Sequence, residues 1–201
     1  MFENPSCIRC SLGSTAKNRC LPNVGNKNCN VAIFLPYPDY MEDRRGRSMV
    51  GQRADFVRWC LKKMGVGIEN VLLDYTIKCY PKKLPGKKAD RMEIVRACRY
   101  YLAGSLQHYK RLRALVALGG ISSEVFTGHT QIGNAEGTSW PVYEPALKSQ
   151  LSHVWVAYDP AAVMENPSLS GSIYRVIFKA CEEAGLKPEP IMGVPTFEFN
   201  R

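Results

Sequence analysis

The strongest constraint on the fold of this chain is a regular alternation of short apolar runs with longer helical patterns. The runs are rich in β-branched and aliphatic residues and cover residues 31–35, 71–77, 115–118 and 154–158. Apolar residues have helical spacing at 51–64 and 90–109, where Asp90 and Glu93 resemble a capping box, and again at 167–185. Because parallel strands need crossover helices that cover both faces of the sheet, the pattern predicts an α/β fold. We expect three layers, α/β/α, around a central four-stranded, mostly parallel sheet.

Length and composition favour one compact domain over residues 1–201. The chain is 45% hydrophobic and 22% charged, close to globular averages, which argues against disorder and coiled coil. No stretch approaches the roughly 20 apolar residues that a membrane span requires, and residues 1–5 lack a basic region followed by an apolar run. We therefore expect a soluble, unexported, cytoplasmic protein with no membrane partner.

Positive charge is concentrated in the middle of the chain. The formal net charge is +9, and residues 42–113 carry 18 Lys and Arg against 7 Asp and Glu. A basic block of this kind suits a polyanion, of which nucleic acid is the commonest, so DNA is a candidate partner. The alternative is a solvated basic face that only maintains solubility.

Eight cysteines in an unexported chain indicate metal binding or core burial, because the cytosol keeps thiols reduced. Cys7 and Cys10 form a C-x2-C pair, a spacing that lets two thiolates bind one metal centre. The chain has no second C-x2-C pair, so further ligands would have to come singly from distant positions. Cys60 and Cys181 lie on apolar helical faces and read as core residues, whereas Cys20 and Cys29 have no assigned role.

The loops after the predicted strands are where functional groups gather in such sheets. None of them carries a P-loop, a G-x-G-x-x-G or an H-E-x-x-H motif, so nucleotide hydrolysis, dinucleotide redox chemistry and zinc proteolysis have no support. We therefore expect no nucleotide cofactor. The three histidines, His108, His129 and His153, have no neighbouring nucleophile, which favours surface or packing roles.

Taken in order, these segments resemble the uracil-DNA glycosylase superfamily, in particular its iron–sulfur family 4. The resemblance runs from about residue 7 to residue 185. It rests on the C-x2-C pair, EDRRGRSMVG at 42–51, IKCYP at 77–81, ACRYYL at 97–102, LVALG at 115–119, YDP at 158–160 and NPSL at 166–169. Each piece is weak alone, but their common order is hard to obtain by chance.

The resemblance implies a 4Fe-4S cluster and a DNA-binding face. Family members use cysteines at the positions of Cys7, Cys10, Cys79 and Cys98, with residues 1–28 packed on the domain as a cluster-binding segment. A cluster of this kind would order the lysine-rich loop between Cys79 and Cys98 against DNA phosphates. Redox sensing is a further role, for which no sequence feature argues. The residues expected to contact phosphates are Arg44, Arg45, Arg47, Lys82, Lys83, Lys87 and Lys88.

The implied base pocket departs from the family pattern at four positions. Pro36 stands where family members carry a water-handling glutamate, and Met49 where a phenylalanine stacks on the flipped base. Tyr75 replaces the asparagine that reads the uracil edge, and Asp159 replaces the histidine that donates to the developing charge on the uracil ring. An aspartate there opposes uracil excision, because removal of one such donor already costs about 10²- to 10³-fold in rate. An alternative alignment would leave Asp39 or Glu42 as the carboxylate.

Two functions from different classes follow. In the first, the chain keeps the glycosylase fold, cluster and basic face, has lost uracil excision and serves as a DNA- and partner-binding module in replication or repair, as viral relatives of the superfamily do. In the second, it is an active glycosylase with a pocket altered for a different or modified base. That pocket would be built around Pro36, Tyr37, Met49 and Tyr75, with Asp159 and Asp39 as the catalytic candidates.

Overall fold

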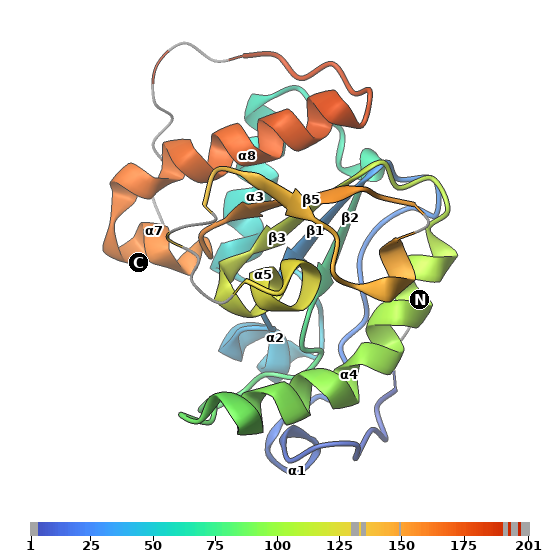
Figure 1. Ribbon diagram of the computed structural model, residues 1–201. Coiled ribbons are helices and arrows are strands. Elements are labelled where there is room, and N and C mark those ends of the chain that lie inside the picture. Colours follow the sequence, from blue (N-terminus) through green and yellow to red (C-terminus); the bar gives the residue numbers. More distant parts are fainter. Residues whose placement is uncertain are drawn as a thin grey trace.

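The sheet at the centre of the molecule has five strands. The computed structural model describes residues 4–129, 133, 136–148, 150–190, 193 and 197. The strands are β1 (Val31–Leu35), β2 (Val71–Tyr75), β3 (Ala114–Leu118), β4 (Ser139–Pro141) and β5 (His153–Ala157). Their order across the sheet is β2-β1-β3-β5-β4, and all pairs are parallel except β4 with β5 (Figure 1). The mostly parallel sheet predicted from the sequence is confirmed.

The fifth strand is a correction to the four that the sequence pattern predicts. β4 has only three residues, Ser139, Trp140 and Pro141, and it pairs antiparallel with β5 at the edge of the sheet. Proline is tolerated at such an edge because its missing N–H is not needed by a further strand. A three-residue segment containing proline carries no alternation, so the sequence pattern gave no sign of it.

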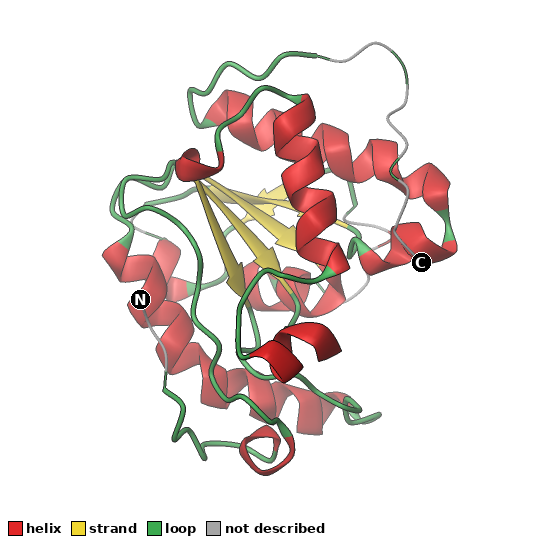
Figure 2. Cartoon of the chain, turned by 180° about the vertical axis from the view of Figure 1, so that it is seen from behind, coloured by secondary structure: helices red, strands yellow, loops and turns green. Residues whose placement is uncertain are grey.

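Helices cover both faces of the sheet (Figures 1 and 2). One face packs against α3 (Gln52–Lys63) and α8 (Ser170–Glu183), and the other against α4 (Lys88–His108) and α5 (Gly119–Thr127). The alternation of strand side chains divides the core accordingly, since Ile33 and Leu35 point to the first layer and Phe34 to the second. The three-layer α/β/α arrangement is thus present as predicted.

Shorter elements connect these layers. They are α1 (Leu12–Thr15), α2 (Tyr40–Arg45), α7 (Ala161–Glu165), and the 3-10 turns η1 (Ile68–Asn70), η2 (Pro145–Leu147) and η3 (Pro167–Leu169). The predicted helix at 167–185 is therefore a 3-10 turn followed by α8. The predicted cap at Asp90 is wrong: α4 begins at Lys88, after Lys87, which makes no side-chain cap. The real capping box is formed by Asp39 and Glu42 at the start of α2.

A buried polar network fixes the segment that follows β2. Asp74 and Lys78 form an ion pair with both side chains almost fully buried. The Ser105 hydroxyl on α4 donates to Asp74 at 3.0 Å, and Asn23 donates to Ser105 at 2.8 Å. A buried charge is tolerated only when paired and hydrogen-bonded, so these four side chains hold three separate segments in one arrangement.

The N-terminal segment runs alongside β2. Val24 forms an antiparallel bridge with Leu73, and the Leu21 N–H donates to the Lys78 carbonyl at 2.8 Å. Leu12 of α1 is buried in the core layer that includes α4, and Figure 1 shows α1 close beneath that helix. In the part of the chain that the structure describes, no helix is long and apolar enough to cross a membrane.

Candidate functional site

A cleft of about 450 Å³ opens where the carboxyl ends of β1, β3 and β5 meet. Gly119, which follows β3, has a φ of +80°, and a Cβ there would lie 2.9 Å from Pro36 and 3.2 Å from Asp159. Glycine therefore allows the three strand ends to approach closely. The residues that line the cleft are Pro36, Tyr37, Leu84, Pro85, Lys88, Arg91, Gly119, Gly120, Ile121, Glu124 and Asp159.

Asp159 is held at the cleft wall by a cation from α3. Its Oδ1 lies 3.2 Å from Nε of Arg53 and accepts the Ala161 N–H at 3.0 Å. Burial raises the pKa of Asp159 above its ordinary value, while the charge of Arg53 acts in the opposite direction. The Arg53 guanidinium also lies over the Tyr37 ring, 4.7 Å from its centroid, and donates to the Tyr37 carbonyl.

The opposite wall of the cleft is formed by the lysine-rich loop and by α4 and α5. Lys88 forms an ion pair with Glu124 at 2.8 Å, which joins the start of α4 to α5. The Arg91 guanidinium donates to the main-chain carbonyls of Pro85 and Gly86. The cleft cations Lys88 and Arg91 are thus already engaged by acceptors of the protein. Sequence reasoning missed Arg53, Arg91 and Glu124, because no motif marks them and their partners are distant in the chain.

The residues of the implied base pocket fall into two groups. Pro36, Tyr37 and Asp159 line the cleft, whereas Met49 and Tyr75 are fully buried and do not line it. The alternative carboxylates do not line it either. Asp39 accepts the Glu42 N–H at 2.9 Å and Glu42 accepts the Asp39 N–H at 2.7 Å, so both serve the capping box of α2.

Tyr75 joins the end of β2 to the segment after α2. Its hydroxyl accepts the Met49 N–H at 2.8 Å and makes a hydrogen bond with the Glu42 carboxylate. Glu42 also accepts the Val50 N–H at 3.1 Å. Met49 has a φ of +57°, a left-handed conformation that is strained for a residue with a side chain. Burial raises the pKa of both Tyr75 and Glu42. We call this group, Glu42, Met49 and Tyr75, the Tyr75 junction.

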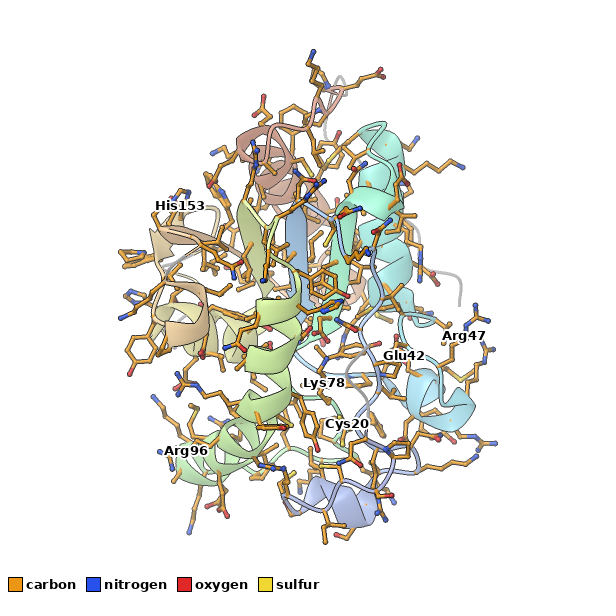
Figure 3. The ribbon with its side chains drawn as sticks, turned by 90° about the vertical axis from the view of Figure 1, so that its right-hand side faces the viewer. Cys20, Glu42, Arg47, Lys78, Arg96 and His153 are labelled. Atoms are coloured by element: carbon orange, nitrogen blue, oxygen red, sulfur yellow. The ribbon has the colours of Figure 1, made fainter. Side chains whose placement is uncertain are left out.

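The predicted phosphate-contacting residues lie on two exposed segments. Arg44, Arg45 and Arg47 are exposed at and just after the end of α2, where Arg44 donates to the Tyr40 hydroxyl at 2.9 Å. Figure 3 shows Arg47 at the margin of the molecule, with Glu42 nearer its centre. The second segment is the loop that borders the cleft, with exposed side chains at Lys82, Lys83 and Lys87, together with Lys88 at the start of α4.

Five cysteines gather where the N-terminal segment, the end of β2 and α4 meet. Cys7, Cys20, Cys79 and Cys98 are buried and Cys10 is half-buried. The Cys20 N–H donates to the Cys79 sulfur at 3.2 Å, and the Lys78 main chain hydrogen-bonds Cys98. Burial raises the pKa of Cys79 to about 11 and that of Cys98 to about 12.

This donor set suits an iron–sulfur cluster, since it offers only thiols, with main-chain N–H groups directed at two of them. Among the described residues, no three or more His, Cys, Asp or Glu side chains are close enough together to hold a single metal ion. The four predicted ligands lie in this group, and Cys20, which had no assigned role, joins them.

The other predicted residues lie apart from both places. Cys60 and Cys181 are buried between α3 and α8, and Cys29 in the core on the α4 side. His153 begins β5 and pairs with Glu183 at 2.9 Å, and the His129 ring packs against Trp140 in a tilted arrangement. None of the three histidines is among the residues that line the cleft.

The Tyr75 junction generates a test of stability. We expect Tyr75→Phe to lower the free energy of unfolding by about 1–3 kcal/mol, because it leaves the buried Met49 N–H and Glu42 carboxylate short of a partner. Urea denaturation measures the change. Tyr143→Phe, at a tyrosine that is 61% exposed, is the matched control and should change stability by less than about 0.5 kcal/mol. Equal stability of Tyr75→Phe and wild type would contradict the role of the junction.

Comparison with known proteins identifies the family to which this chain belongs. The profile of the Uracil DNA glycosylase superfamily matches residues 22–181. Two relatives are each named Type-4 uracil-DNA glycosylase. The protein of Pyrobaculum aerophilum is 27% identical over 175 residues, 85% of each chain, and that of Archaeoglobus fulgidus is 28% identical over 195 residues, 94% of each. The profile spans most of the chain and includes all five strands and the cleft, so this chain belongs to the uracil-DNA glycosylase superfamily.

Proposed function

We propose that this chain is an iron–sulfur DNA-binding protein that has lost uracil excision and serves as a DNA- and partner-binding module in replication or repair. The observation that carries the proposal is the Tyr75 junction. Met49 and Tyr75 stand at the two positions whose side chains would stack on uracil and recognise its edge in family 4. Both residues are buried, and the Met49 N–H donates a hydrogen bond to the Tyr75 hydroxyl.

Opening the junction for a base would be costly. A base placed there would have to separate the Met49 N–H from the Tyr75 hydroxyl and Tyr75 from Glu42. Each buried polar group left without a partner costs about 1–3 kcal/mol. A phenol also lacks the paired donor and acceptor of an amide, so Tyr75 could not read the uracil edge as asparagine does.

Asp159 adds an electrostatic argument. Uracil excision leaves negative charge on the departing ring, and a preorganised donor to that charge is worth about 10²- to 10³-fold in rate. Asp159 lines the cleft as a carboxylate paired with Arg53. A carboxylate at that place repels the developing charge.

DNA binding is supported by the distribution of cations. The exposed Arg44, Arg45 and Arg47 and the lysine-rich loop are those that the sequence predicts to contact phosphates. Arg91 and Lys88 tie the end of that loop to its surroundings, so its exposed lysines are presented from an anchored segment. Phosphate contacts of this kind give affinity with little dependence on sequence.

The cluster would be held by Cys7, Cys10, Cys79 and Cys98. When bound, it supplies covalent links between the N-terminal segment, the end of β2 and α4. The chain's own contribution is the main-chain donation from Cys20 to Cys79 and from Lys78 to Cys98. Such hydrogen bonds orient and tune the ligands of a metal centre.

A second candidate function is an active glycosylase for a different base. The observation that favours it is the cleft itself, which keeps an aromatic ring and a partly buried carboxylate, Tyr37 and Asp159, at the carboxyl edge of the sheet. Release of a base other than uracil from duplex DNA would select this function over the binding module.

Uracil excision gives the direct test of the proposal. We expect no measurable release of uracil by wild-type protein and little by Asp159→His, because groups that act as a unit restore little singly. The quadruple variant Asp159→His, Tyr75→Asn, Met49→Phe and Pro36→Glu should excise measurably. Gel analysis of uracil-containing duplexes after alkaline cleavage measures the rate. Wild-type turnover of about one per second or faster would overturn the proposal.

Salt dependence tests the phosphate contacts. We expect the logarithm of the DNA association constant to fall linearly with the logarithm of salt concentration. Changing Lys82, Lys83 and Lys87 to Gln should reduce the slope by about three, because each cation that contacts a phosphate contributes about one. Fluorescence anisotropy at several salt concentrations measures it.

The matched control removes the same charge elsewhere. Lys62 and Lys63 end α3, and Lys110 follows α4, all three exposed. Changing these three to Gln should leave the slope almost unchanged. Equal slopes for wild type and the loop variant would mean that the basic block is only a solvated face.

The cluster is tested by colour and composition. Purified protein should be brown, with about four iron and four sulfide per chain. Cys79→Ala and Cys98→Ala should lose the visible absorbance and the iron and should bind DNA more weakly. Cys60→Ala and Cys181→Ala remove buried thiols from the other core layer and should keep the iron, the visible absorbance and the affinity for DNA. One zinc per chain in anaerobically prepared protein, with no iron, would contradict the cluster.

A further inference from the structure

The cleft wall offers carboxylate acceptors beside cations that already have partners in the protein. Arg53, next to the cleft, bonds Asp159 and the Tyr37 carbonyl, Lys88 bonds Glu124, and Arg91 bonds main-chain carbonyls. Two carboxylates, Asp159 and Glu124, line the same cleft. A ligand that brings a hydrogen-bond donor therefore finds a carboxylate to accept it.

Asp159 is the acceptor best placed for this purpose. Its Oδ1 is taken by Arg53 and the Ala161 N–H, whereas Oδ2 has no hydrogen-bond partner among the described residues. The side chain is 20% exposed, so it is not sealed into the core. The ion pair with Arg53 fixes the orientation of the carboxylate.

The rest of the cleft suits a flat ring. Tyr37 offers an aromatic surface, and Pro36, Leu84, Pro85 and Ile121 provide apolar walls. The space of about 450 Å³ is within the range of small-ligand sites. A cationic amine is disfavoured, because the three cations Arg53, Lys88 and Arg91 outnumber the two carboxylates around the cleft.

We propose that the cleft receives an unpaired nucleobase that carries an exocyclic amino group, and that Asp159 Oδ2 accepts a hydrogen bond from that amino group. Cytosine and adenine present such a donor, whereas uracil and hypoxanthine present a carbonyl oxygen at the same ring position. A carboxylate attracts the first pair and repels the second. Tyr37 stacks on the base. This inference rests on the proposed binding of DNA, and it names the base class that the site accepts.

The experiment compares oligonucleotides that differ only at one mismatched base. Fluorescence anisotropy measures the dissociation constants of hairpin duplexes with central C·T and U·T mismatches, and of a second pair with adenine or hypoxanthine at a mismatch. We expect the amino-bearing base to bind about tenfold more tightly in each pair, the usual order for a hydrogen bond to a charged group.

Variants assign the preference to its residue. Asp159→Asn should equalise the two members of each pair, because an amide offers both a donor and an acceptor. Asp55→Asn, an exposed carboxylate on the same side of the sheet, is the matched control and should leave the preference intact. Tyr37→Ala should weaken all four mismatched duplexes. Circular dichroism checks that each variant is folded.

The outcomes separate this inference from the proposed function. Equal affinity of wild type for C and U, or a preference that survives Asp159→Asn, overturns the inference while DNA binding stands. Failure to bind any duplex overturns the proposed function itself. Release of cytosine or adenine from these duplexes would support the inference and would select the active-glycosylase alternative.

Discussion

The hydrogen bond between the Tyr75 hydroxyl and the Met49 N–H determines what the rest of the site can do. It closes the space between the end of β2 and the segment after α2, and Glu42 completes it from the capping box of α2. The closure allows Met49 to remain in a left-handed conformation that would otherwise be strained. Because Tyr75, Met49 and Glu42 bond one another, a ligand at the carboxyl edge of the sheet can reach instead the neighbouring cleft, which Pro36, Tyr37 and Asp159 line.

The end of β2 and the residues that follow it connect the Tyr75 junction with the group of cysteines and the lysine-rich loop. Tyr75 points into the layer of α3 and α8, while the adjacent Asp74 is buried against Lys78 and Ser105 on α4. Cys79 then enters the group of cysteines, where it accepts the Cys20 N–H, and the lysine-rich loop begins directly after it. A change in the position of this stretch would therefore move the junction, the thiols and the lysine-rich loop together. The buried ion pair of Asp74 and Lys78, despite its cost of desolvation, anchors this stretch to α4 through Ser105.

Much of this could be read from the sequence, because burial periodicity is a local property. The apolar runs predicted four strands, and the order of motifs predicted the superfamily that the profile match confirms. β4 escaped because three residues at a sheet edge have no periodicity. Arg53 was placed on a helix, but its contact with Asp159 joins residues far apart in the chain, which no local pattern records. Likewise the sequence marked Tyr75 and Met49 as unusual, whereas only the fold places the hydroxyl of one against the N–H of the other.

In the proposed function Tyr75 and Met49 occupy the place where a family 4 enzyme would hold uracil, and the Met49 amide reports directly on their hydrogen bond. Two-dimensional NMR of ¹⁵N-labelled protein follows the shift and the hydrogen exchange of that amide. We expect slow exchange in the free protein and the same shift and exchange rate with saturating thymine-containing or uracil-containing duplex. A Met49 amide that exchanges at the rate of an open loop, or that shifts only with the uracil-containing duplex, would contradict the closure of this site by Tyr75 and Met49.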